Sequence, residues 1–139
     1  MGFFKDLRGA FITIANADTG SGGLVPLSGS TNPLWYWGNH KNEELPVATF
    51  VIIAGEEGTS AAKNTATVRF IVWNQPASGA TYIAVAEDMR DRIKAIMTNT
   101  QLTAQGVDAA PMKPGYRDLP PDNDGIIGLV MELEFFNGE

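Results

Sequence analysis

The chain has 139 residues, 44% hydrophobic and 19% charged, a composition that fits one domain with a buried core and argues against a disordered chain. Sixteen acidic and ten basic residues give a net charge of −6, which argues against a protein that holds nucleic acid on a cationic surface. The absence of cysteine excludes disulfides, thiolate metal sites and a cysteine nucleophile. The longest apolar run, residues 47–54, is too short to span a bilayer.

The N-terminal part of the sequence predicts a helix, a loop and an extended segment. Hydrophobic residues recur at heptad-like spacing through residues 3–17, which predicts a short amphipathic helix: Phe4, Leu7, Phe11 and Ile14. Residues 18–33 are rich in glycine, serine and asparagine and predict a loop. The aromatic residues Trp35, Tyr36 and Trp37 follow, and we expect them to be extended.

Two strands are predicted in the middle of the chain. Residues 47–54 and 66–73 are rich in β-branched and aromatic side chains, and the second run alternates between two faces. Their connection, residues 55–65, is long for a hairpin, so we expect it to project from the domain, as we do for the loop near residues 19–33.

A long amphipathic helix is predicted over residues 80–97, where apolar residues repeat at spacings of four and three: Tyr82, Ala86, Met89, Ile93 and Ile96. On its charged side Asp88 precedes Arg92 by four residues, the spacing of a helical ion pair. Residues 98–125 are polar and interrupted by prolines, with room for one short extended piece. Residues 126–136 predict a final strand. This order predicts a single α+β domain over residues 1–139, in which a mainly antiparallel sheet packs against the N-terminal helix and the long helix.

The net charge is concentrated at the C-terminal end of the sequence. Residues 118–139 contain six acids and no base, whereas the rest of the chain is neutral: Asp118, Asp122, Asp124, Glu132, Glu134 and Glu139. The same stretch is rich in apolar residues, so we expect an ordered strand with acids on one side.

Three short segments resemble parts of metal-binding or phosphate-binding sites but lack the other residues that such sites require. His40 has no second histidine with which to share a metal, which favours a surface loop residue. The segment Gly20-Ser21-Gly22-Gly23 does not continue as a phosphate-binding loop. In a calcium loop aligned on Gly125, Pro120 and Met131 would occupy positions that require acids, so residues 122–125 predict a turn instead.

Two further groups each have two interpretations. Glu132 and Glu134 share one side of the final strand, about 7 Å apart at ~3.3 Å per residue. They could act as an acid–base pair, or they could form a solvated strand face, which the lack of an accompanying nucleophile or cationic subsite favours. Trp35 and Trp37 share a face opposite Tyr36, and this triplet fits either core packing or an interface.

The order of these segments resembles the tail terminator family of long-tailed bacteriophages, also called tail completion or tail-to-head joining proteins. The resemblance rests on the strand at residues 67–73 followed by the helical residues 84–93. It also includes Leu45-Pro46-Val47 before the first long strand and the alternating apolar residues 129–136. The Gly/Ser-rich residues 19–32 and the proline-rich residues 108–121 depart from the family pattern.

The resemblance implies a structural virion protein without catalytic residues, metal or cofactor. Such proteins form a homo-oligomeric ring, typically a hexamer, at the head-proximal end of the tail tube. Their partners are the tail tube protein and the head-completion or connector protein, with DNA only in transit and no membrane. The location implied is the neck of the virion, after assembly in the host cytoplasm. The alternatives are another neck or tail protein (head completion or tail tube), or a small-molecule-binding domain or enzyme.

Two sets of site residues follow from this hypothesis. An acidic lining would repel DNA phosphates in the pore, and we expect it to include Glu132, Glu134, Asp122 and Asp124. Contacts between subunits or with partners are expected from the aromatic triplet and the projecting loop, at Trp35, Tyr36, Trp37, Glu56 and Glu57.

Overall fold

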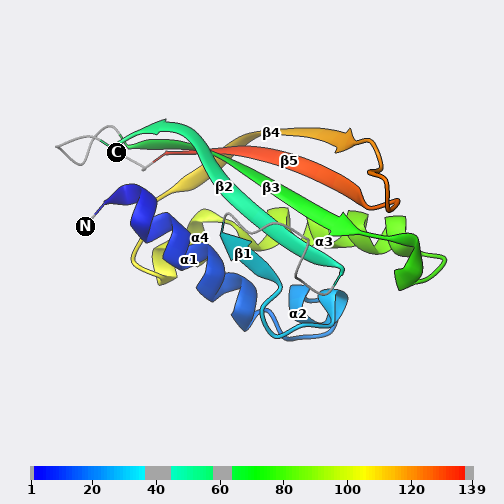
Figure 1. The fold of residues 1–139 in the computed structure, drawn as a ribbon. Helices are drawn as coiled ribbons and strands as arrows, with labels where there is room; N and C mark the ends of the chain where they lie inside the picture. Colours follow the sequence, from blue (N-terminus) through cyan, green and yellow to red (C-terminus); the bar gives the residue numbers. More distant parts are fainter. Residues whose placement is uncertain (1, 37–44, 58–63, 137–139) are drawn as a thin grey trace.

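Helix α1 (Phe3–Ala17) begins the fold in the computed structural model, which describes residues 2–36, 45–57 and 64–136 (Figure 1). Its buried residues recur every three or four positions and form one apolar stripe: Phe3, Leu7, Ala10, Phe11, Ile14 and Ala15. The helix predicted over residues 3–17 is therefore confirmed.

The loop expected over residues 18–33 contains a short helix, α2 (Leu24–Ser28), so that expectation is wrong in part. The Asp18 carboxylate accepts a hydrogen bond from the backbone N–H of Leu24 at 2.7 Å, which satisfies a donor at the start of this helix. Gly29 ends it in the left-handed conformation, with φ of 72°. Leu24 is fully buried, so this part of the segment packs against the fold instead of projecting from it.

Five strands form one sheet in the order β1-β2-β3-β5-β4. They are β1 (Leu34–Tyr36), β2 (Val47–Glu56), β3 (Thr65–Asn74), β4 (Ala110–Leu119) and β5 (Ile127–Phe136). Only the β1–β2 pair is parallel among these strands, and the other three pairs are antiparallel. The expected α+β class with a mainly antiparallel sheet is confirmed.

The proline-rich segment is more ordered than the sequence suggests. Helix α4 (Asn99–Ala104) forms after Thr98, whose hydroxyl accepts from the N–H of Gln101. A ten-residue strand, β4, then replaces the short extended piece expected there. Its prolines are tolerated because β4 is an edge strand, with a register shift between Met112 and Gly115.

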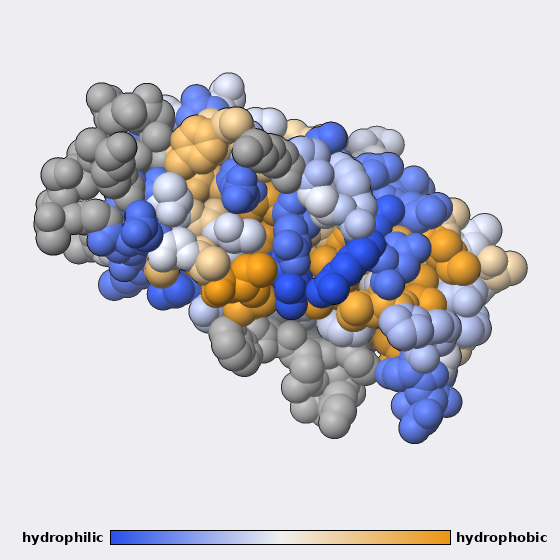
Figure 2. Space-filling model, turned by 90° about the horizontal axis from the view of Figure 1, so that it is seen from above, coloured by the Kyte–Doolittle hydropathy of each residue, from blue (hydrophilic) through white to orange (hydrophobic). Residues whose placement is uncertain are grey.

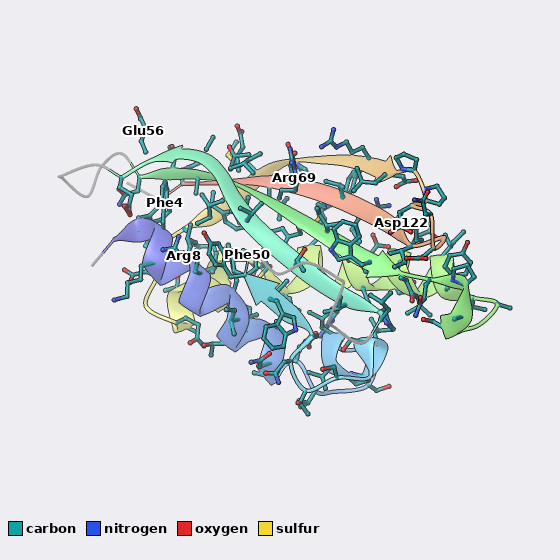
Figure 3. All side chains as sticks on the ribbon, viewed as in Figure 1. Phe4, Arg8, Phe50, Glu56, Arg69 and Asp122 are labelled. Carbon is teal, nitrogen blue, oxygen red and sulfur yellow. The ribbon has the colours of Figure 1, made fainter. Side chains whose placement is uncertain are left out.

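Helix α3 (Tyr82–Ile96) follows a short 3-10 turn, η3 (Pro76–Ser78), and lies with α1 on one face of the sheet (Figure 1). Phe11 of α1 meets three rings of the sheet in the core between the layers, with centroid distances of 5.0–5.4 Å: Phe50, Phe70 and Phe135. Figure 3 shows Phe50 on the helix side of the sheet and Arg69 on the other side. The two predicted faces of residues 66–73 are thus confirmed.

Candidate functional site

The sheet face opposite the helices, which we call the outer sheet face, carries both apolar patches and charged side chains. It consists of alternate residues of the five strands in register: Trp35, Thr49, Val51, Thr67, Arg69, Ile71, Trp73, Arg117, Val130, Glu132 and Glu134. No described helix covers this face, and Figure 2 shows hydrophobic patches on it separated by hydrophilic bands. Exposed apolar patches with a polar surround are typical of contact surfaces.

Aromatic side chains give the outer sheet face its apolar area. Trp35 is 39% exposed and stands in register with Thr49. Trp73 donates its indole N–H to the Thr49 hydroxyl at 3.0 Å, which fixes the ring against the sheet. Met112 on β4 is exposed at the other edge strand. Trp35 is therefore partly covered and partly in solvent, and its role in an interface stays a prediction.

An ion pair lies near the centre of this face. Arg69 Nε donates to Glu132 Oε2 at 2.8 Å across the β3–β5 pair, and both side chains are about one-third exposed. Gly115 of β4 lies opposite Glu132 of β5. Because glycine has no side chain, a hollow of about 370 Å³ lies at this point. Arg117 also lines this hollow and forms no ion pair with any described residue. Two arginines and one glutamate leave one positive charge there.

The four acids expected to line a pore do not form one cluster. Glu132 is compensated by Arg69, and Glu134 is exposed two residues further along β5. Asp122 lies in the turn between β4 and β5, where its carboxylate accepts from the N–H groups of Asp124 and Ile126 at 2.8 and 3.0 Å (Figure 3). This arrangement confirms the turn predicted over residues 122–125. Placement of these acids at a pore stays a prediction.

The residues expected at an interface occupy different environments. Tyr36 lies on the helix side of the sheet, with the Arg8 guanidinium 4.9 Å from its ring centre and the Phe50 ring at 5.2 Å. Glu57 accepts from the backbone N–H of Phe4 at 3.0 Å and so caps the start of α1. Glu56 is exposed at the end of β2 (Figure 3). Trp37 and His40, together with residues 58–63 of the expected projecting loop, lie outside the described residues.

Helix α3 carries a surface that the sequence did not single out. Its solvent side presents Ile83, 46% exposed, followed by three exposed carboxylates, Glu87, Asp88 and Asp91. None of these carboxylates forms an ion pair with a described residue. We call these four residues the α3 acidic surface. Next to it a hollow of about 360 Å³ lies between α2 and α3.

The arginines of α3 bind elsewhere in the fold. The ion pair expected between Asp88 and Arg92 is replaced by a contact between Arg92 and Asp18, 74 residues away, through two hydrogen bonds of 2.6 and 2.7 Å. Hydrogen bonding from Arg92 lowers the pKa of the Asp18 carboxyl. Arg90 contacts Asp118 at 3.4 Å and lies 5.0 Å from the ring centre of Tyr116. The helix thus uses its arginines to hold α2 and β4, which leaves its carboxylates in solvent.

Neither a metal cluster nor a membrane span was found within residues 2–36, 45–57 and 64–136. No group of three or more histidine, cysteine, aspartate or glutamate side chains there is arranged to hold a metal ion. No helix in those ranges combines the length and the apolar character needed to cross a membrane.

The comparisons with known proteins relate the chain to others by fold alone. No protein-family profile matches the sequence, and no curated protein sequence matches it. Among solved structures, the fold is similar to that of a chain from the virion of a native gene transfer agent particle, with a TM-score of 0.55 and 11% sequence identity. The similarity of fold extends over 94% of this chain and 95% of that one.

Proposed function

We propose that this chain is a structural protein of a phage-like virion and that its role is that of a tail terminator. The observation that carries the proposal is the similarity of fold, over nearly the full length of both chains, to a component of a gene transfer agent virion. The order of strands and helices that resembles the tail terminator family supports the specific role. The chain has no enzymatic activity in this proposal.

In this role each subunit is one α+β domain, and several copies, six in the typical case, form a ring on the head-proximal end of the tail tube. The ring stops tube growth and offers a surface to the head-completion or connector protein, while DNA passes through its pore. Assembly takes place in the host cytoplasm, and the product is the neck of the virion. The exposed apolar patches of the outer sheet face supply contact area of the kind that such assemblies need.

The acidic side chains support passage of DNA through such a ring. Carboxylates repel phosphates, so an acidic lining keeps DNA from adhering to the pore. Asp122 and Asp124 are exposed in the turn before β5, and we propose that they face the pore, whereas Glu134 belongs to the outer sheet face. Glu132 contributes less to the repulsion of DNA phosphates than its sequence position suggests, because Arg69 compensates its charge.

Negative-stain electron microscopy of the purified protein, at high concentration and with and without isolated tail tubes, tests the proposal. Discrete rings, or caps that form only at one end of the tubes, are the expected result. Long cylinders would assign the chain to the tube class instead. Rings that bind head connectors but ignore tube ends would indicate head completion. A monomer that binds neither would refute a neck role, and a ligand-dependent increase in melting temperature would then support a small-molecule-binding domain.

A further inference from the structure

The two layers of the fold leave two different surfaces on opposite sides of the chain. The outer sheet face lies on one side, and the solvent side of α3 lies on the other. The buried residues of α3, Ala86, Met89 and Ile93, point toward the sheet, so the residues between them point away from it. A single copy therefore cannot bring its own α3 acidic surface to its own outer sheet face.

The charges of the two surfaces complement each other. The α3 acidic surface holds three carboxylates that form no ion pair with a described residue, against one exposed base, Lys94, three positions after Asp91. Two of the carboxylates, Glu87 and Asp91, lie one turn apart. Like charges at this spacing destabilise a helix by itself, so an external cation would relieve the repulsion. The hollow on the outer sheet face has one surplus positive charge, with Arg117 free to pair among the described residues.

Both surfaces also offer apolar area, which on the outer sheet face lies on the two edge strands. Ile83 is 46% exposed at the N-terminal end of the α3 acidic surface. On the outer sheet face, Trp35 and Met112 are 39% and 42% exposed. An interface with apolar contacts and a few paired charges fits the composition of protein–protein contacts better than a site for a small ion does.

The β4 edge of the sheet is a poor alternative for contact between copies. Strand β4 forms one edge, and Pro111 and Pro114 interrupt its row of backbone N–H groups. The register shift between Met112 and Gly115 bends the same edge. Prolines and irregularities of this kind prevent pairing of edge strands from two chains. Contact between copies is therefore disfavoured at the β4 edge, which borders the hollow on the outer sheet face.

We infer that the outer sheet face of one copy binds the α3 acidic surface of a second copy, with a carboxylate of that helix entering the hollow beside Arg117. The inference rests on the proposed function for the requirement that copies assemble. Every copy uses two different surfaces, so the contact is head-to-tail and generates a ring when the rotation closes. The Arg69–Glu132 pair lies beside the entering carboxylate, and Glu132 holds the Arg69 guanidinium in place.

Charge reversal on each surface tests the inference. The sheet variant is Arg117→Glu, and the helix variant combines Glu87→Arg with Asp91→Arg. A control variant, Lys5→Glu, makes the same change of charge as the sheet variant at an exposed position on α1, outside both surfaces. Circular dichroism and thermal unfolding verify that each variant is folded, and native mass spectrometry with light scattering measures the oligomeric state.

The expected result has a specific pattern, because each copy contributes one surface to each contact. Either variant alone should lose assembly, with at least a tenfold weaker association than the wild-type protein, whereas the control should assemble normally. An equimolar mixture of the two variants should assemble again, since the reversed sheet surface meets the reversed helix surface and the intact surfaces meet each other. Such rings contain the two variants in alternation and have an even number of subunits.

Other outcomes overturn the inference and separate it from the proposed function. Rings or tube caps that persist in both variants would leave a terminator role intact and refute this interface. Normal assembly of the helix variant alone would indicate that two outer sheet faces pack together. Wild-type cylinders that both variants abolish would support the interface and refute the terminator role. A wild-type protein that stays monomeric at all concentrations, with and without tubes, would refute both.

Discussion

Among the ion pairs of the described residues, the contact between Arg92 and Asp18 should contribute most to the stability of the fold. The Asp18 side chain is 10% exposed, and the Arg92 side chain is 38% exposed. Two hydrogen bonds join their side chains, and a third runs from the Leu24 N–H to Asp18. Arg92→Ala therefore leaves a mostly buried carboxylate with one hydrogen bond in place of three.

The magnitude follows from these contacts. Hydrogen bonds to charged groups contribute about 1.5–3 kcal/mol, and partial exposure of the guanidinium reduces what its loss costs. We expect Arg92→Ala to lower the free energy of unfolding by about 2 kcal/mol. Asp18→Ala also removes the acceptor at the start of α2, which adds about 1 kcal/mol. In the double variant the two losses should not add, because both remove the same pair.

Urea denaturation followed by tryptophan fluorescence measures these free energies, with Lys94→Ala as the matched control. Lys94 is exposed on the same helix and forms no ion pair with a described residue, so its loss should change the stability by less than about 0.5 kcal/mol. An Arg92→Ala protein as stable as the control, or single losses that add fully in the double variant, would contradict the reasoning.

Three further predictions concern acid stability, a glycine and the core. Because the pKa of Asp18 lies below its unfolded value of about 3.9, the ionised carboxylate stabilises the fold above that pH; the difference in unfolding free energy between wild type and Asp18→Asn should shrink from pH 7 to pH 3. Gly55→Ala should lower the free energy of unfolding by several kcal/mol, because φ is 152° and an added Cβ would collide with the backbone of β3. The control Gly20→Ala adds a Cβ in open space and should leave the free energy of unfolding unchanged in the same urea titration. Phe11→Ala should cost about 3–5 kcal/mol by removing the ring at the centre of the core, measured as a lower urea midpoint at unchanged slope.

The sequence predicts those elements whose pattern is local and periodic. Helices α1 and α3 and strands β2, β3 and β5 lie within two residues of their expected bounds, because alternation and heptad-like spacing follow directly from which face is buried. The sequence underestimates the length of β4, because Pro111 and Pro114 argue against a strand unless that strand lies at the edge of a sheet. Position in the sheet is a property of the whole fold and has no local signal.

The candidate surfaces were predicted less well, because they depend on contacts between residues far apart in the sequence. The spacing of Asp88 and Arg92 favours a local pair, but a better acceptor, Asp18, reaches Arg92 from 74 residues away. The exchange leaves Asp88 without its expected partner. The amphipathic pattern of residues 80–97 indicates a charged side for this helix, but it does not indicate which of its charges stay unpaired.

The distribution of charge in the fold differs from its distribution in the sequence. The acids of the last 22 residues were expected to form one acidic side, yet Asp118 pairs with Arg90, Glu132 pairs with Arg69, and Asp122 holds the turn before β5. Bases from the neutral part of the chain thus pair with two of the six C-terminal acids. Because Arg90 and Arg92 of α3 pair with Asp118 and Asp18, the exposed carboxylates of this helix have no arginine partner. The same ion pairs that stabilise the subunit therefore determine which of its surfaces stays charged, and that surface is the one we propose as the contact with a second copy.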